Sequence, residues 1–207
     1  MDRSLFVVTG TLILSALASQ AQQITSALPE APKPQVMTPA PLSYTPPTQR
    51  ERFRYYVRNT YGISSVIEAG VRGGIDQALD RPSQWPEGAE GYADRMGSAM
   101  GEIAVRGTTE YVFSDLFRED LRHIPCDSSC TQSAFARAFD DTFTARKGAD
   151  GHRAFSVARL LGPVAAGVVA RETWYPGGYS DRQVVGEVGI NYGFTFIRSY
   201  IRELVHR

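Results

Sequence analysis

Apolar residues recur with the period of an α-helix through most of the chain from residue 49 onward. Start and stop signals divide this part into the expected helical segments 49–61, 65–79, 87–122, 133–146, 152–173 and 181–205. Three pairs of residues have the spacing of a capping box at a helix start: Thr48 and Glu51, Ser65 and Glu68, and Ser180 and Gln183. Because alternating β-branched runs are few, we predict an all-α fold for residues 49–207, a compact bundle of about five helices.

Two places fit this pattern less well. Pro163 lies inside segment 152–173 and would free the carbonyl of Arg159, so we expect a kink or a break there. Residues 188–196 alternate as a strand would, but they also continue a helical stripe: Ile190, Phe194, Ile197, Ile201 and Leu204. Since the stripe extends to Leu204, we favour a helix over a strand.

Small residues recur at every fourth position within the helical segments. The rows are Gly70, Gly74 and Ala78; Ala93, Gly97 and Gly101; Ala154, Ala158, Gly162, Ala166 and Ala170; and Gly189 and Gly193. Positions four apart share one helix face, so each row is a flat stripe along which another helix can approach closely. The candidate helix-packing residues are Gly70, Gly74, Gly97, Gly101, Ala158, Gly162 and Ala166. The rows indicate architecture rather than chemistry.

The beginning of the chain has the pattern of a secretory signal peptide. Arg3 precedes an apolar run, Leu5 to Leu17, and Ser19-Gln20-Ala21 has the small-x-small form of a cleavage site. We expect cleavage after Ala21 and export to the periplasm or cell envelope, and an uncleaved anchor is the alternative. Residues 22–48 contain seven of the 12 prolines and predict a disordered linker. We favour a spacer over a docking ligand because the prolines show no regular repeat.

Charge restricts the partners. The 22 basic and 22 acidic residues balance, which argues against nucleic acid. Four arginines, at 50, 52, 54 and 58, interleave with the aromatics of the first helix. An amphipathic helix with its aromatics in the core is the favoured interpretation, and contact with anionic lipid headgroups is the alternative. Residues 154–170 are near the lower limit for spanning a bilayer, whereas the other helices carry several charges, so the helices cannot all span. We expect a soluble or membrane-peripheral bundle.

Cys126 and Cys130 are the two cysteines of the chain. In an exported protein a disulfide between them is the simplest expectation. His123 with the two cysteines would supply three metal ligands, but no fourth ligand is near in sequence, so we predict no metal site.

Motifs of catalysis are lacking. The sequence has no G-x-S-x-G elbow, P-loop or H-E-x-x-H, and the adjacent Asp140 and Asp141 would point about 100° apart on a helix. We therefore expect a non-enzymatic protein without a cofactor, and an enzyme without these motifs is the third alternative.

Four blocks, RERFRYYVRNTYG, RPSQWPEGAEGYADRMGSAMG, GHRAFSVARLLGPVAAG and TWYP, resemble those of a family of uncharacterised exported bacterial proteins that also begin with a signal peptide and a Pro-rich lead. The Cys126–Cys130 loop departs from that pattern. The resemblance implies export and assigns no activity. We expect a structural or interaction module of the cell envelope whose partner is an envelope protein or a membrane surface. A membrane-active protein with Gly/Ala-striped helices and a homo-oligomer are the alternatives.

Overall fold

The computed structural model describes residues 44–123, 131–177 and 179–205. The predicted signal peptide, residues 22–43 of the predicted linker, and both Cys126 and Cys130 lie outside the described residues, so cleavage and the disulfide stay predictions. The compact unit starts at Tyr44, before the expected boundary at residue 49. Tyr44 belongs to it because its hydroxyl donates to Asp120 Oδ2 at 3.2 Å.

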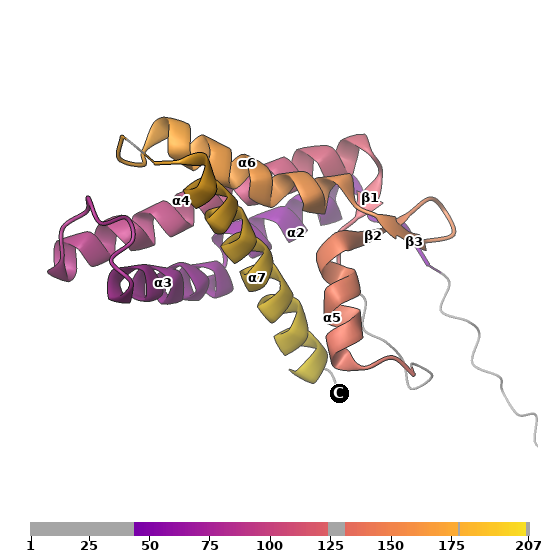
Figure 1. Ribbon diagram of the computed structural model, residues 1–207. Coiled ribbons are helices and arrows are strands. Elements are labelled where there is room, and N and C mark those ends of the chain that lie inside the picture. Colours follow the sequence, from indigo (N-terminus) through magenta and orange to yellow (C-terminus); the bar gives the residue numbers. More distant parts are fainter. Residues whose placement is uncertain (1–43, 124–130, 178, 206–207) are drawn as a thin grey trace, which may run out of the picture. The chain divides into compact units, whose positions relative to one another are not determined.

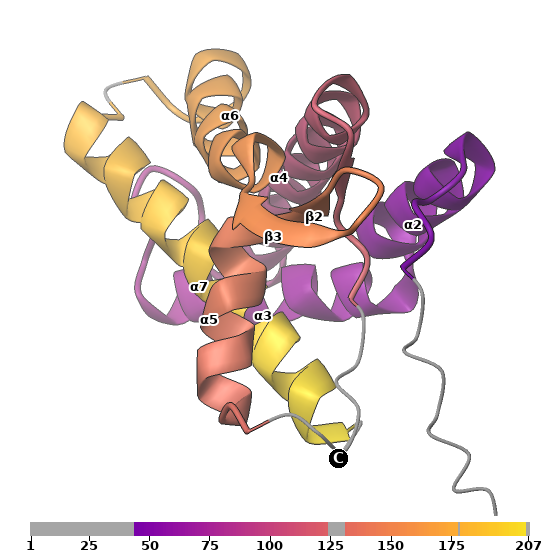
Figure 2. The ribbon, with the colours of Figure 1, turned by 90° about the vertical axis from the view of Figure 1, so that its right-hand side faces the viewer.

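Helices dominate the described residues, and the all-α prediction is confirmed. Their bounds are α2 Gln49–Tyr61, α3 Ile63–Ala78, α4 Gly88–Leu116, α5 Ala134–Phe143, α6 Val157–Thr173 and α7 Asp181–Val205. The 29-residue α4 packs against α3 on one side, α6 on another and α2 along its C-terminal half (Figure 1). Helix α7 packs against α6 with its first half and against α5 with its second half (Figure 2).

Local signals predicted two helix starts correctly. Thr48 and Glu51 form a complete capping box before α2. Before α7, the backbone N–H of Ser180 donates to Gln183 Oε1 at 2.8 Å, and the Gln183 N–H donates to Ser180 Oγ at 3.4 Å. The predicted start at Ser65 is wrong: α3 begins at Ile63, and the Ser65 hydroxyl instead donates to the Asn59 carbonyl at 2.5 Å.

Two uncertain segments are helical. Residues 188–196 lie inside α7, as favoured from the stripe. The expected break at Pro163 is absent, since α6 runs through this residue. One face of α6, which includes Ala158, Gly162 and Ala166, is buried, and this packing outweighs the one backbone hydrogen bond that proline removes.

A small antiparallel sheet corrects three helix boundaries. Its strands, in spatial order, are β1 Glu119–Asp120, β2 Thr144–Lys147 and β3 His152–Phe155. The predicted helices to 122, to 146 and from 152 are therefore wrong at those ends. Gly148 and Gly151 have φ of +71° and +66°, so the turn between residues 147 and 152 reverses the chain and allows β2 to pair with β3.

The small residues differ in how closely other atoms approach them. In α3 a Cβ added at Gly73, which is outside the predicted row, would lie 2.9 Å from the backbone nitrogen of Met96 in α4. At Gly70 the nearest atom is 3.4 Å away and at Gly74 it is 4.0 Å away, both in the Tyr92 side chain. Helices α3 and α4 therefore approach most closely at Gly73.

The other candidate packing positions lie on α4 and α6. A Cβ at Gly101 would lie 3.1 Å from the Trp174 ring, whereas nothing lies within 4 Å of one at Gly97. On α6, a Cβ at Gly162 would lie 2.8 Å from Glu110 Cγ. Ala158 and Ala166 are fully buried.

Within the described ranges, no helix has both the length and the apolar character needed to cross a membrane.

The interior contains few large apolar side chains. Most buried apolar residues are alanines, and Ile103, Leu121, Tyr179 and Val184 are the larger ones among the described residues. The largest fully buried side chains include Arg72, Arg95, Glu102 and Glu119. Since charged groups are seldom fully buried unless they are paired, the pairing of these groups decides how the bundle holds together.

Candidate functional site

Two rows of charged side chains face each other between α3 and α4. Each helix contributes an acidic, a basic and an acidic residue spaced by four: Glu68, Arg72 and Asp76 on α3, and Glu102, Arg106 and Glu110 on α4. The helices are antiparallel, so Arg72 Nη2 meets Glu102 Oε2 at 2.8 Å and Arg106 Nη2 meets Glu68 Oε1 at 2.9 Å. These four side chains are at most 6% exposed. Alternating charge at helical spacing thus fixes the register of the two helices.

Helix α7 closes the network with Asn191. Its amide nitrogen donates to Glu102 Oε2 at 2.7 Å, and its amide oxygen accepts from Arg72 at 3.3 Å and from Arg106 at 3.2 Å. From the same helix, Arg198 forms an ion pair with Glu68. A single buried amide therefore joins both ion pairs of the other two helices.

Two tyrosines after α6 donate further hydrogen bonds to the carboxylates of the network. The Tyr175 hydroxyl donates to Glu102 Oε1 at 2.6 Å, and the Tyr179 hydroxyl donates to Glu187 Oε1 at 2.9 Å. The two rings stack with their centroids 4.4 Å apart. The segment between α6 and α7 is thereby attached to the network of buried ion pairs that joins α3, α4 and α7, which we call the ionic core.

Burial and neighbouring charges shift the acidities in opposite directions. Burial, and after it the charge of Glu102, raises the pKa of Glu187 to about 7. Burial acts the same way on Glu68, but the charges of Arg106 and Arg198 outweigh it and lower the pKa of that carboxyl. Glu187 also borders a cavity of about 380 Å³ beside the turn that follows α3. Its bonding partners, Arg72 and Tyr179, both act in holding helices together, so we interpret the network as structural.

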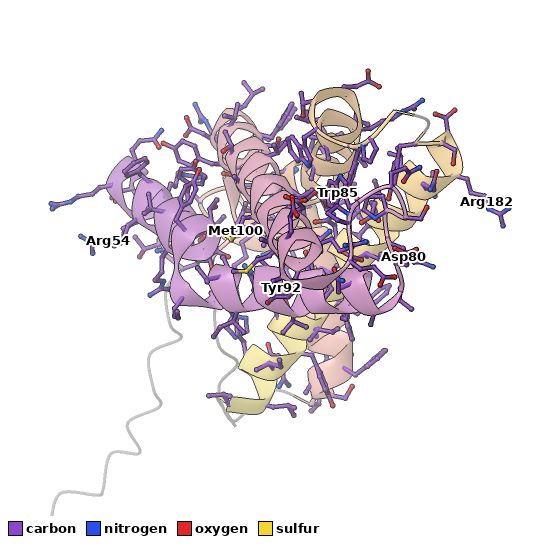
Figure 3. The ribbon with its side chains drawn as sticks, turned by 90° about the vertical axis from the view of Figure 1, so that its left-hand side faces the viewer. Arg54, Asp80, Trp85, Tyr92, Met100 and Arg182 are labelled. Atoms are coloured by element: carbon purple, nitrogen blue, oxygen red, sulfur yellow. The ribbon has the colours of Figure 1, made fainter. Side chains whose placement is uncertain are left out.

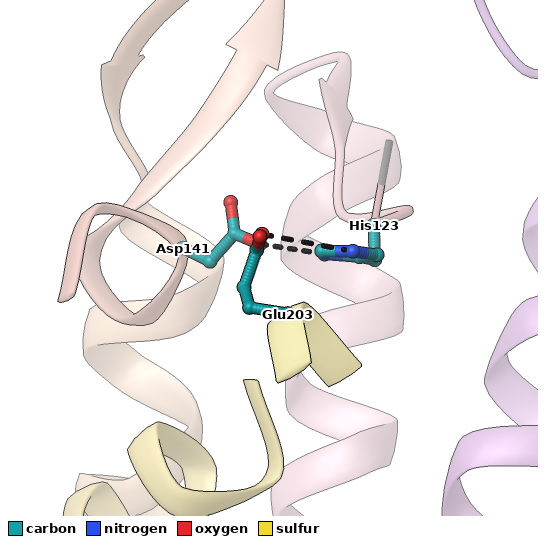
Figure 4. A group of neighbouring side chains, drawn as sticks. All are labelled: His123, Asp141 and Glu203. Atoms are coloured by element: carbon teal, nitrogen blue, oxygen red, sulfur yellow. Dashed lines mark hydrogen bonds and ion pairs between the residues drawn. The ribbon is translucent and has the colours of Figure 1, made fainter. Parts of the chain in front are cut away.

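A second cluster joins three distant parts of the chain (Figure 4). His123 Nδ1 lies 2.8 Å from Asp141 Oδ2 in α5, and its Nε2 lies 3.7 Å from Glu203 Oε1 in α7. Each carboxylate also has an arginine partner at 2.5 Å, Arg153 for Asp141 and Arg137 for Glu203. Burial alone would raise the pKa of Asp141, but the His123 hydrogen bond and the charges of Arg159 and Arg153 lower it to about 2.

One imidazole and two carboxylates form a ligand set that divalent metals accept. Here the two ring nitrogens of His123 face different carboxylates, and Arg137 and Arg153 already balance the charge of those carboxylates. We therefore interpret the cluster as an ion-paired joint between α5 and α7.

Sequence reasoning identified only part of these sites. It separated Asp141 from Asp140, and the structure agrees, since Asp141 is buried in the cluster and Asp140 is half-buried outside it. The sequence pattern did not reveal Glu203, because this residue is far from His123 along the chain and no local spacing connects the two. The alternating charges of α3 and α4 were the signal that could have predicted their pairing.

Searches against protein-family models, curated proteins and solved structures found no match for this chain. The resemblance to exported bacterial proteins therefore stays a prediction.

Asp141→Asn should destabilise the fold in a pH-dependent way. The folded pKa of about 2 lies below the ordinary 3.8, so the charged carboxylate stabilises the fold above pH 4, and this contribution is lost as the pH falls through 2. A shift of this size corresponds to about 2 kcal/mol at pH 7. Urea unfolding of both proteins, from pH 7 to pH 2, measures the difference. Asp140→Asn is the control, and a pH-independent difference for Asp141→Asn would contradict the assignment.

Proposed function

We propose that this chain is a non-enzymatic protein of the bacterial cell envelope that associates with a membrane through the outer faces of its helical domain. The observation that carries the proposal is the placement of charge on α3, α6 and α7: their charged side chains lie on the inner sides or in the end turns, and the outward faces between them are uncharged.

Helix α3 shows this most clearly. An outward row at intervals of four residues consists of Ile63, Ile67, Val71, Ile75 and, just after the helix, Leu79, each between 44 and 76% exposed. All the charged residues of α3 belong to the inner row, where Glu68 and Arg72 are buried and Asp76 is half-buried. The face is about 24 Å long at 1.5 Å per residue.

Helices α6 and α7 repeat the arrangement. The exposed residues of α6 before Arg171 are Leu160, Leu161, Val164 and Val168. Those of α7 after Gln183 are Val185, Gly186, Gly189, Gly193, Ile197, Ile201, Leu204 and Val205. The exposed charges of these two helices lie in their end turns: Arg171, Glu172, Asp181 and Arg182.

Single exposed apolar residues are ordinary on a soluble protein, whereas continuous apolar faces over a charged interior are not. In water such a bundle gains no hydrophobic stabilisation from its largest apolar side chains, because they stay exposed. In hydrocarbon the exposure of those side chains carries no free-energy cost. Buried ion pairs and close backbone contacts can then hold the helices together, since lipid removes the hydrophobic effect between them. The charged residues that lower the hydropathy of α3 lie on its inner side, and those of α7 lie on its inner side or in its first turn.

A single protein partner would cover these apolar faces less completely than a membrane would. Helices α3 and α6 both pack on α4 and lie on opposite sides of it, with α6 above and α3 below in Figure 1. One partner of ordinary interface size buries about 800 Å² of one face. The hydrocarbon around a domain inserted in a bilayer offers the same chemistry to opposite faces at once, so it is the occupant we favour over a second copy or an envelope protein.

Vesicle flotation tests the proposal. The full chain, diluted from detergent into phosphatidylcholine vesicles, is expected to float with the lipid. Ile67→Asp with Ile75→Asp should reduce the floated fraction at least tenfold, because a charge placed in hydrocarbon costs about 3 kcal/mol. Ala89→Asp, an exposed position next to Glu90, is the control and should float normally.

Circular dichroism of the variants in detergent checks that they fold. If the full chain stays monodisperse in detergent-free buffer and does not float, the proposal is wrong.

A further inference from the structure

A basic pocket lies where the apolar face of α3 begins. It has a volume of about 610 Å³ and lies between α2, the first residues of α3, the segment Arg122–His123 and the end of α7. Its charged lining consists of Glu51, Arg54, Arg58, Arg122 and Arg202, with His123 beside them. Four arginines and one carboxylate line the pocket, so it is positively charged even though Arg122 is paired with Asp120.

The arginines of the pocket differ in what already binds them. Arg122 is paired with Asp120 at 2.9 Å, and Arg202 donates to the amide oxygen of Asn59 at 2.7 Å. Arg54 and Arg58 are exposed, one turn apart on α2, and no carboxylate within the described parts of the chain forms an ion pair with either. Arg54 lies on the outward side of α2 (Figure 3). Two guanidinium groups are thus free to bind an anion.

The pocket and the apolar face share a residue. Ile63 lines the pocket, is 76% exposed, and is the first member of the α3 row that continues with Ile67. A ligand that fills both parts has an anionic head and an apolar body joined to it.

We infer that this pocket binds the phosphate group of an anionic phospholipid, whose acyl chains lie along Ile63 and Ile67. The inference rests on the proposed function, because it names the lipid class that the same surface selects. Arginine suits the head because its planar fork matches phosphate oxygens bidentately. A free phosphate would gain nothing from the adjacent isoleucine row, and the lipid source is favoured for that reason.

The test compares vesicles of phosphatidylcholine alone with vesicles of equal parts phosphatidylcholine and phosphatidylglycerol. The full chain should bind the anionic vesicles much more tightly. The double variant Arg54→Gln with Arg58→Gln should reduce the ratio of the two affinities about thirtyfold, since each basic residue near an anionic surface contributes about 1 kcal/mol. The same variant should still bind phosphatidylcholine.

The control removes the same charge elsewhere. Arg118 and Arg182 are exposed and lie outside the pocket, and Figure 3 shows Arg182 on the opposite side of the domain from Arg54. Arg118→Gln with Arg182→Gln should lose much less of the preference. An equal loss would overturn the inference and show general attraction to a negative surface.

Two further outcomes separate the hypotheses. Excess inorganic phosphate should not displace the anionic vesicles; displacement would assign the pocket to free phosphate and overturn the lipid. Equal binding to both vesicle types would refute this inference and leave the proposed function intact, whereas absence of binding to either would refute both.

Discussion

Glu102→Leu should lower the free energy of unfolding by about 3–5 kcal/mol, the usual result of removing one member of a buried ion pair. Glu102 accepts hydrogen bonds from Arg72, Asn191 and Tyr175, and its side chain is 1% exposed. The substitution leaves the Arg72 guanidinium buried, with Glu187 at 3.5 Å as its nearest carboxylate. Urea unfolding in mild detergent, followed by circular dichroism, measures the loss.

The informative control is the double variant Arg72→Met with Glu102→Leu. Replacing both members of a buried pair by apolar residues of similar volume is often neutral or stabilising. The double variant should therefore recover most of the stability that Glu102→Leu loses. If the double variant loses as much stability as Glu102→Leu and Arg72→Met lose separately when added together, the two side chains do not interact and the interpretation of the ionic core is wrong.

The sequence predicts the helices of this domain because their signals are local. The capping boxes at Thr48 and Ser180 depend on residues three apart, and the structure confirms both. Ser65 has the same local signal, but the preceding helix ends at Tyr61 and offers the Asn59 carbonyl to its hydroxyl, so this competing hydrogen bond replaces the cap. The strand pairing of β2 with β3 was missed because each strand has only four residues.

The candidate sites were predictable to a smaller extent. The arginines at 54 and 58 were singled out with contact to anionic lipid as the alternative interpretation, but the pocket also needs Arg202, which folding brings from the last helix. Likewise, His123 was noted beside the cysteines, whereas its carboxylate neighbours in the described chain are Asp141 and Glu203. Such contacts depend on how α7 crosses the bundle, and no local pattern encodes that crossing.

The small-residue rows illustrate the same limit. Spacing by four selects Gly70 and Gly74, while the closest backbone approach is at Gly73. A glycine row shows that a helix can be approached closely, and the position of the partner helix decides which glycine is needed.

Gly73→Ala and Gly74→Ala should therefore have opposite effects on stability, although they are neighbours in one helix. Alanine is a better helix former than glycine by about 1 kcal/mol at either position. At Gly73 the added Cβ would lie 2.9 Å from the backbone nitrogen of Met96 and force α3 and α4 apart. Overpacking of this kind costs about 1–3 kcal/mol, so Gly73→Ala should be destabilised despite its helix propensity.

At Gly74 the nearest atom is in the Tyr92 ring, 4.0 Å from the added Cβ, so nothing opposes the gain in propensity. The two variants should differ by about 1–3 kcal/mol in free energy of unfolding, because the propensity gain is common to both and the overpacking cost acts at Gly73 alone. Thermal and urea unfolding of both proteins in the same detergent provide the comparison. Equal stabilisation of both variants would mean that α3 and α4 are not in close contact at Gly73, and the register that pairs Arg72 with Glu102 would lose its support.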